Sequence, residues 1–222
     1  MISAPLALSL EVALLATLIA GTLGIAVGAL LALRRFPGRD LLDVLITTPL
    51  VLPPTVLGYY VLVSLGRRSP LGALFERLTG GPIVFTRTAA VIAATIGALP
   101  LITKSARAAL EAVDPTLGRA ARTLGAGPLR TFFTVQAPLA LRGLVAGLML
   151  GFARSLGDFG VTLMVAGDIP GETQTAALAV YDALQAQRDA EAAGLVAVLS
   201  AVVVLVLYLV NKLTLTGRRN DL

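Results

Sequence analysis

The chain contains 222 residues, of which 56% are hydrophobic and only 14% are charged, and its formal net charge is +5. A soluble domain of this length needs more charge to cover its surface, so the composition predicts a polytopic membrane protein. The sequence has no cysteine and no histidine, which excludes thiolate metal sites and removes the commonest general base. The basic residues are spread over loops between apolar segments, a pattern that argues against nucleic acid as a partner.

Residues 12–33 form the first predicted transmembrane helix. They carry no charge, and a helix of this length spans about 33 Å, enough to cross a hydrocarbon core of about 30 Å. The segment before it lacks the basic region of a cleaved signal peptide, so we expect this span to be retained. Gly24 and Gly28 within it either mark a helix-packing face or reflect the glycine-rich composition.

Residues 44–65 form the second predicted span, and three prolines interrupt it. Pro49, Pro53 and Pro54 remove backbone donors inside the membrane, so the helix is expected to be kinked and buried against protein. Two interpretations stay open for these prolines: an element that lines or gates a transport path, or a structural kink. A loop follows, with a short interfacial helix predicted around residues 71–78.

Residues 88–108 form the third predicted span, which is the weakest by hydropathy. Its uncharged part ends at Thr103 and includes a proline. Lys104 and Arg107 are expected to extend their long side chains toward the membrane surface. The fifth predicted span, residues 192–211, carries no charged residue.

Residues 140–166 form the fourth predicted span. Three glycines recur there at every fourth position: Gly143, Gly147 and Gly151. This spacing predicts a smooth face for close helix packing. Arg154 and Asp158 are also four residues apart and can pair on one helix face, whereas an isolated charge inside a membrane costs at least about 2.5 kcal/mol. The pair is interpreted either as a fixed packing element or as part of a gate or pathway.

Five spans place the two termini on opposite sides of the membrane. With the amino terminus outside, twelve basic residues fall in cytoplasmic segments: Arg34, Arg35, Arg39, Lys104, Arg107, Arg119, Arg122, Arg130, Arg142, Lys212, Arg218 and Arg219. Five fall in outer loops: Arg67, Arg68, Arg77, Arg87 and Arg188. By the positive-inside rule this asymmetry predicts a periplasmic amino terminus and a cytoplasmic carboxyl terminus.

Residues 111–142 form the longest polar interruption in the chain, yet apolar residues alternate there with arginines as in short amphipathic helices. Gly125 and the pair Gly127-Pro128 are expected to divide the segment into two helices, because glycine permits a left-handed turn and proline suits a first helical position. The second helix has an apolar side made of Leu129, Phe132 and Phe133. An ordinary helix on the membrane surface is the alternative interpretation.

The chain contains no G-x-x-x-x-G-K-S/T motif, so it has no P-loop that could bind ATP. We therefore expect the protein itself not to be an enzyme. Any ATP-driven work has to be supplied by another subunit.

The spacing inside the polar segment resembles the EAA loop of ABC importer permeases. Five positions match that loop: Ala120, Ala121, Gly125, Val135 and Pro138. Two positions depart from it, because Arg119 stands in place of the glutamate and Ala137 in place of the leucine. The resemblance implies that residues 111–138 are a cytoplasmic coupling loop. In that family the helix carrying Leu129, Phe132 and Phe133 would sit in a groove of an ATPase subunit.

Further segments resemble the permease subunit of bacterial molybdate ABC importers: PLVLPPTVLGYY, GRRSPLG, FARSLGDFG and IPGETQT. In that family a glutamate is more usual at the position of Asp158. The resemblance implies an all-α type I ABC importer permease fold with about five spans, in one domain over residues 1–222 with its core at 9–212. It also implies a homodimer in the bacterial inner membrane, ATPase subunits that bind ATP and magnesium, and a periplasmic molybdate-binding protein, with no cofactor or metal in this chain.

The function implied by this resemblance is ATP-driven import of molybdate, with tungstate, sulfate and thiosulfate as alternative anions. Two other classes of protein are weighed against it. A secondary transporter needs inverted repeats and intramembrane carboxylates for its coupling ions, and one buried aspartate among five spans does not meet that need. A structural membrane protein has no reason to keep the EAA spacing.

Overall fold

The computed structural model describes the backbone of residues 3–218 and the side chains of residues 3–212. Within this range every regular element is a helix, in the order α1 Ser3–Leu33, α2 Arg39–Val51, α3 Pro54–Leu65, α4 Pro70–Thr79, α5 Arg87–Glu111, α6 Pro115–Thr123, α7 Pro128–Thr131, η1 Phe132–Gln136, α8 Ala137–Leu156, α9 Gly160–Ala166, α10 Ala176–Gln185 and α11 Asp189–Arg218. The predicted all-α fold is confirmed. Arg219, which contributes to the predicted charge asymmetry, lies outside the described residues.

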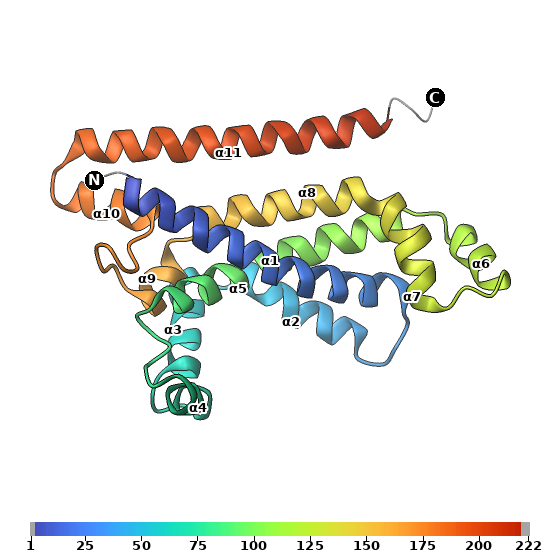
Figure 1. Cartoon of the computed structure of the whole chain (residues 1–222), viewed down its shortest axis with the longest axis horizontal. Helices are drawn as coiled ribbons and strands as arrows, with labels where there is room; N and C mark the ends of the chain where they lie inside the picture. Colours follow the sequence, from blue (N-terminus) through green and yellow to red (C-terminus); the bar gives the residue numbers. More distant parts are fainter. Residues whose placement is uncertain (1–2, 219–222) are drawn as a thin grey trace.

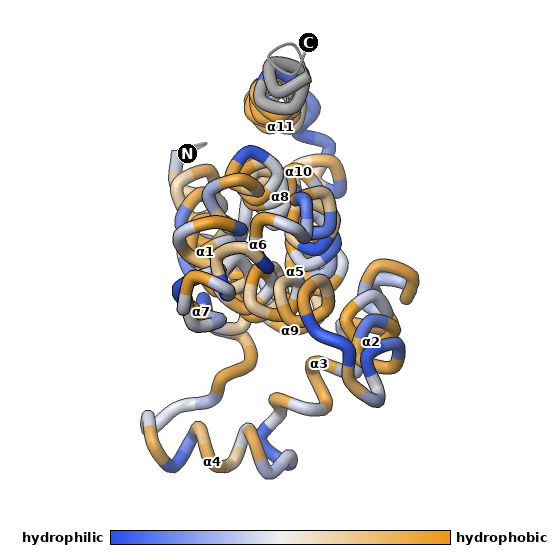
Figure 2. Tube along the Cα trace, turned by 90° about the vertical axis from the view of Figure 1, so that its right-hand side faces the viewer, coloured by the Kyte–Doolittle hydropathy of each residue, from blue (hydrophilic) through white to orange (hydrophobic). Residues whose placement is uncertain are grey.

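Helix α5 is the centre of the bundle (Figure 1). It lies against α1 and α8 along much of its length and also contacts α2 and α9. Figure 2, which looks along the bundle, shows α11 on one side of this group and α4 on the other. Four helical runs in the described part of the chain are long and apolar enough to cross a membrane, and the pair of α2 and α3 makes five.

Glycines let α1 and α8 approach α5 from two sides. A Cβ atom at Gly28 of α1 would lie 2.9 Å from the Cβ of Ala106. On α8, a Cβ at Gly147 would lie 2.7 Å from the Cβ of Ser105. Gly143 and Gly151 meet α5 in the same way. The smooth face predicted on the fourth span is therefore confirmed, and the α1 glycines mark a packing face.

We expect Gly147→Leu to destabilise the protein, because four extra carbon atoms cannot fit against Ser105 without separating α8 from α5. Overpacking of this kind costs about 1–3 kcal/mol. Thermal unfolding of the purified protein in detergent should show a lower Tm. Gly81→Leu is the matched control, because no atom lies within 4 Å of a Cβ atom at that position. Equal Tm values for the two variants would contradict the packing described here.

The second predicted span, residues 44–65, is not one kinked helix. It consists of α2 and α3, which are bent by 114° relative to each other. Leu52 and Pro53 have extended ψ angles of 138° and 136°, because a residue that precedes proline is pushed out of the helical region. Pro54 then occupies the first position of α3, and Pro49 stays inside α2. Consecutive prolines therefore end one helix and start another.

The pair of α2 and α3 still carries the chain from one end of the bundle to the other (Figure 1). At its start, Arg39 donates to the carbonyl oxygen of Leu31 at the end of α1 and lies 3.3 Å from Glu111 at the end of α5. Phe85 lies after α4 and just before α5 begins, and its amide donates to the carbonyl oxygen of Val165. The start of α2 and the start of α5 thus lie at opposite ends, which agrees with five crossings.

The fourth predicted span, residues 140–166, begins earlier than expected. One helical run covers Pro128–Leu156 through α7, η1 and α8, so the second short helix predicted in the polar segment is the beginning of this span. The π-helical turn η1 joins them because Pro138 has no amide hydrogen to donate. In this turn the amide of Ala137 donates to the carbonyl oxygen of Phe132, five residues back.

The same span also ends earlier than expected, because α8 stops at Leu156 and α9 begins only at Gly160. The carboxylate of Asp158 accepts from the amide of Thr162 at 3.1 Å. A side chain that binds backbone amides in this way favours the start of a new helix over continuation of the old one. The second predicted span, with its proline cluster, and the fourth, with Arg154 and Asp158, are therefore both broken helices.

Candidate functional site

The polar segment forms one end of the bundle, where α6 lies outermost (Figure 1). Helix α6 begins with Asp114 at its N-cap and Pro115 at its first position. The amide of Thr116 donates to Asp114 Oδ1 at 2.8 Å. Hydrogen bonds from Thr116 lower the pKa of the Asp114 carboxyl, so this cap is ionised and holds the start of the helix at neutral pH.

The end of α6 depends on Gly125, which has a φ of +84°. The amide of Gly125 donates to the carbonyl oxygen of Arg122, and the amide of Ala126 donates to that of Ala121, both at 3.0 Å. These two bonds form a Schellman motif. A Cβ atom at Gly125 would have open space around it. Glycine is thus required here for its backbone conformation, which is the left-handed turn predicted from the sequence.

Helix α6 exposes apolar side chains at the outer end of the bundle. Leu117 is 46% exposed and Leu124 is 89% exposed, whereas Gly118 is buried beside Gln136 of η1. We call Leu117 and Leu124 the α6 patch. Leu124 is not among the residues predicted from the sequence, although a leucine directly before a helix-ending glycine was an available signal.

The other positions of the EAA-like loop are spread over this end of the bundle. Ala120 is exposed on α6, as is Arg119, which departs from the pattern, while Ala121 of α6 and Val135 of η1 are half-buried. Pro138 is exposed near the start of α8. Apart from Gly125, the pattern therefore marks positions along the surface of the loop rather than one cluster.

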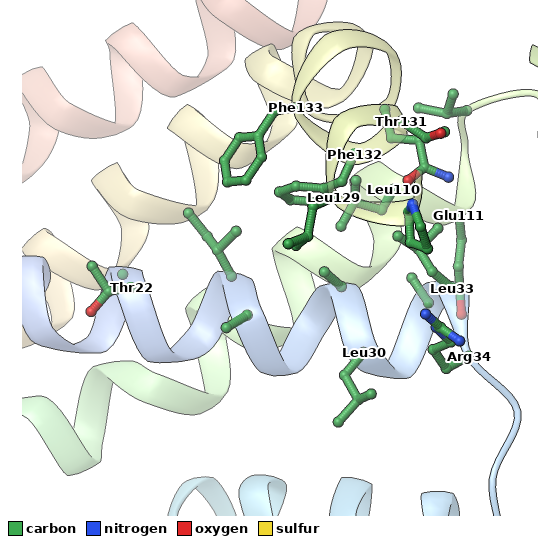
Figure 3. Close-up of a pocket in the computed structure, with 18 of the residues that line it drawn as sticks. Thr22, Leu30, Leu33, Arg34, Leu110, Glu111, Leu129, Thr131, Phe132 and Phe133 are labelled. Atoms are coloured by element: carbon green, nitrogen blue, oxygen red, sulfur yellow. The ribbon is translucent and has the colours of Figure 1, made fainter. Parts of the chain in front are cut away.

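Leu129, Phe132 and Phe133 point toward α1 rather than away from the bundle (Figure 3). They line a groove of about 1080 Å³ between α1 and the segment formed by α7 and η1. Leu129 and Phe133 remain largely exposed in it, while Phe132 packs against a cluster that includes Leu110. The predicted apolar side of this helix exists, but it faces this groove, and the α6 patch is the apolar surface at the outer end.

The two broken helices meet in the structure. Helix α3 packs on α9, and a Cβ atom at Gly160 would lie only 2.6 Å from the Cβ of Pro54. A Cβ at Gly58 would lie 2.8 Å from the Cβ of Met164. The structure therefore joins the Pro53-Pro54 break to the segment that follows Asp158, two features that the sequence analysis had considered separately.

The predicted pair of Arg154 and Asp158 is formed, with Arg154 Nη1 donating to Asp158 Oδ1 at 3.0 Å. The other oxygen, Asp158 Oδ2, accepts from the hydroxyl of Thr162 at 2.6 Å as well as from its amide. Asp158 is 3% exposed, and a Cβ atom at Gly97 of α5 would lie 3.4 Å from Arg154 Nη2. The carboxylate therefore neutralises the arginine and also anchors the first turn of α9.

A charge cluster that the sequence analysis did not identify attaches α2 to α5. Asp43 accepts from Lys104 at 2.7 Å and from Arg107 at 2.9 Å. Glu111 accepts from Arg107 at 2.8 Å and lies 3.3 Å from Arg39. We call these five residues the α2–α5 charge cluster. No residue of α2 is buried, so this cluster is a main attachment of the helix to the bundle.

The signal that could have revealed this cluster was the spacing of charges on α5. Lys104, Arg107 and Glu111 are three and four residues apart and share one helix face. Lys104 and Arg107, which are predicted to extend toward the membrane surface, both bind Asp43. That Asp43 of α2 is their acidic partner could not be predicted from the sequence, because Asp43 and Lys104 are brought together only by the fold.

At the opposite end of the bundle, residues 167–175 form a tightly bonded loop that includes the IPGETQT segment. The carbonyl oxygen of Ile169 accepts from three following amides. Ser9 of α1 accepts from the amide of Ala176 at 2.7 Å, which ties the loop to the amino-terminal part of the chain. Burial raises the pKa of the Asp168 carboxyl in this loop.

The chain is thus a bundle of helices long and apolar enough to cross a membrane, with two breaks that meet at the contact of α3 and α9 and an amphipathic helix at one end. The family pattern described as "Binding-protein-dependent transport system inner membrane component" matches residues 24–215. This chain belongs to that family, and it is accordingly a multi-pass membrane protein.

Relatives cover nearly the whole chain. It is 42% identical over 205 residues to the molybdenum transport system permease protein ModB of Escherichia coli (strain K12), which covers 92% of this chain and 90% of that protein. The protein of the same name from Haemophilus influenzae is 45% identical over 80% of this chain and 78% of its own length. The sulfate transport system permease protein CysT of Salmonella typhimurium is 32% identical over 95% of this chain and 76% of its own length.

Solved structures support the fold. A chain of the MetNI methionine ABC transporter superposes with a TM-score of 0.62 at 21% identity, covering 96% of this chain and 90% of that chain. A chain of an amino acid ABC transporter superposes with a TM-score of 0.61 at 20% identity, covering 98% and 93%. The predicted ABC importer permease fold is confirmed.

Proposed function

We propose that this chain is the membrane-spanning subunit of an ATP-driven importer that carries molybdate across the inner membrane. The observation that carries this proposal is the similarity, over nearly the whole chain, to permeases named for molybdenum transport, which is greater than the similarity to the sulfate permease. Tungstate, sulfate and thiosulfate are the competing anions. The sequence contains no P-loop motif, and in this proposal ATP and magnesium are bound by a partner ATPase subunit.

The proposed assembly contains two copies of this chain, cytoplasmic ATPase subunits and a periplasmic molybdate-binding protein. Membership of a binding-protein-dependent transport family supports these partners. The exposed apolar side chains of α2 support a second copy beside it, because Leu41, Val44 and Val51 are all more than half exposed. The bonded loop at residues 167–175 offers a defined surface to the binding protein at the outer side.

In the proposed mechanism the α6 patch docks on the ATPase. A shift of α6 moves α5, because only a short connection after Glu111 joins the two helices. The α2–α5 charge cluster then transmits the movement from α5 to α2. Helix α2 then swings about the Pro53-Pro54 break, while α3 stays packed on α9. Alternating access requires an element with two arrangements, and this break is the hinge that separates them.

The spans do not hold a strong anion site in this proposal. Asp158 neutralises Arg154 at 3.0 Å, so the pair offers no net positive charge to a divalent anion. The pair instead holds the gate region where α8, α9 and α5 meet. Recognition of the anion is therefore assigned mainly to the binding protein.

Uptake of radiolabelled molybdate tests the function, using cells that lack their own molybdate permease and express this chain with its ATPase and binding protein. Unlabelled molybdate should compete at the lowest concentration, and sulfate only in large excess. Equal competition by sulfate would assign the transporter to the sulfate class. Uptake that persists without the ATPase subunit would point to a secondary transporter instead.

Single introduced cysteines test the orientation, since the native chain has none. Leu124→Cys is well placed because Leu124 is 89% exposed at the α6 end. In cells that express this chain without the ATPase subunit, we expect an impermeant thiol reagent to label it in inside-out vesicles and not in intact cells. Gln187→Cys, in the exposed turn before α11, should show the reverse pattern. Labelling of Leu124→Cys in intact cells would overturn the proposed orientation.

A further inference from the structure

The groove between α1 and the α7–η1 segment, which we call the α1 groove, has the shape of a lipid site. Its volume of about 1080 Å³ is slightly above the roughly 300–1,000 Å³ found for pockets that hold drug-sized ligands. It follows α1 from Thr17 to Arg34, a distance of about 25 Å along a helix. One leaflet with its headgroup layer is about 20–22 Å thick, so the groove matches a single leaflet in length.

The walls of the α1 groove become more polar toward α6 (Figure 3). Leu18, Ile25 and Leu148 line the part far from α6, where Thr17 and Thr22 are the polar residues. Toward α6, the lining includes Arg34, Glu111 and Thr131. An occupant therefore has a long apolar part and a polar group at one end, which is the chemistry of a phospholipid.

The polar end favours a negatively charged occupant. Arg34 and Arg122 both line it, and neither forms an ion pair with another residue in the described part of the chain. Two acidic residues also line it. Glu111 is paired with Arg107 and Arg39, whereas Asp114 stays ionised as the N-cap of α6, so the two arginines outweigh the one unpaired carboxylate.

We propose that an acidic phospholipid occupies the α1 groove, with its phosphate between Arg34 and Arg122 and one acyl chain along α1. Its placement in the cytoplasmic leaflet follows from the proposed orientation. A helix of a second copy would fill the apolar part but would leave both arginines without an anion. Inorganic phosphate would pair with the arginines but would leave the apolar walls uncovered. The lipid joins α1 to α7 and thereby holds the base of the coupling segment in place.

Quenching of an introduced tryptophan by brominated lipids tests this proposal, since the native chain has no tryptophan. The protein is purified with its partner subunits and reconstituted in mixed vesicles. Ala26→Trp places the reporter in the groove, about 12 Å along α1 from Arg34. Leu23→Trp is the control, because Leu23 is 52% exposed but does not line the groove. Brominated phosphatidylglycerol is compared with brominated phosphatidylcholine at equal mole fraction.

The ratio of quenching by the two lipids should be higher at Ala26→Trp than at Leu23→Trp. Each basic residue near a membrane surface contributes about a fivefold preference for anionic lipid. Arg34→Gln should therefore lower the preference by about fivefold, and adding Arg122→Gln should remove it. Arg35→Gln with Arg130→Gln is the matched control, because it removes the same charge nearby but outside the groove, and it should leave the preference unchanged.

Three results would overturn the proposal. Equal quenching by both lipids at Ala26→Trp would show that the groove does not select an acidic headgroup. Weak quenching by both, together with a disulfide between copies carrying Ala26→Cys, would show that a second copy covers the groove. Loss of the preference on addition of millimolar inorganic phosphate at constant ionic strength would assign the arginines to a soluble anion. None of these readouts depends on transport, so the lipid site and the transport function can fail separately.

Discussion

Asp158→Ala is expected to abolish transport and to lower the folded yield strongly. The substitution leaves the guanidinium of Arg154 without its partner and removes both hydrogen bonds that anchor Thr162 at the start of α9. Removing one partner of a fully buried ion pair costs about 3–5 kcal/mol, and the charge left by Asp158→Ala costs less than this because the Arg154 side chain is 34% exposed. Arg154→Ala should still be milder, because the carboxylate keeps its hydrogen bonds from the amide and hydroxyl of Thr162. Uptake rate and folded yield in detergent measure both effects.

A double-mutant cycle shows whether the two charges are coupled. The double variant should lose less than Asp158→Ala and Arg154→Ala lose in sum, but it should not recover fully, because the amide and hydroxyl of Thr162 stay without the carboxylate. Asp158→Asn is the control that keeps a hydrogen-bond acceptor and removes the charge. Simple addition of the two losses would contradict the pairing. If Arg154→Ala raised the anion concentration needed for half-maximal uptake at an unchanged maximal rate, the arginine would bind substrate.

Gly125→Val is expected to remove most of the uptake while the protein remains at its normal level in the membrane. A φ of +84° costs an L-residue about 1–2 kcal/mol, and a β-branched side chain fits this conformation poorly. The Schellman motif would open and displace Leu124, which is part of the α6 patch. The bundle itself should persist, since no atom lies within 4 Å of a Cβ at this position.

Gly125→Asn is the matched variant, because asparagine tolerates the left-handed region better than valine does. It should keep a substantial part of the uptake. Co-purification with the ATPase subunit from tagged protein in mild detergent measures the docking step directly. Wild-type uptake and co-purification of Gly125→Val at equal membrane abundance would remove this turn from the mechanism.

Features that depend on neighbouring residues were predictable from the sequence. The turn at Gly125, the helix start at Pro128 and the i, i+4 pair of Arg154 and Asp158 each follow from residues within one or two helical turns. The short helix predicted around residues 71–78 is α4 for the same reason, since Ser69 and Pro70 form an N-cap and a first position. Local backbone preference and helix periodicity act without knowledge of the fold.

The size of the breaks could not be predicted in this way. Three prolines indicate a kink, but the 114° bend between α2 and α3 is possible only because α3 finds α9 to pack on. The early end of α8 likewise depends on an environment in which Asp158 is shielded by protein. The direction of Leu129, Phe132 and Phe133 toward α1 was equally invisible, because periodicity identifies an apolar side without saying what covers it.

Composition alone determined that this is a helical membrane protein, because backbone polar groups in lipid have to be satisfied within each helix. Only the tertiary structure decided which helix is central. Hydropathy ranks the α5 span below α11, with mean values of 1.6 and 2.8, yet 61% of the apolar stretch of α5 is buried and only 11% of that of α11. Hydropathy measures the preference for lipid, and a helix surrounded by other helices does not need it. Helix α5 instead needs small residues for close contact and charges that can find Asp43, and those contacts exist only in the folded chain.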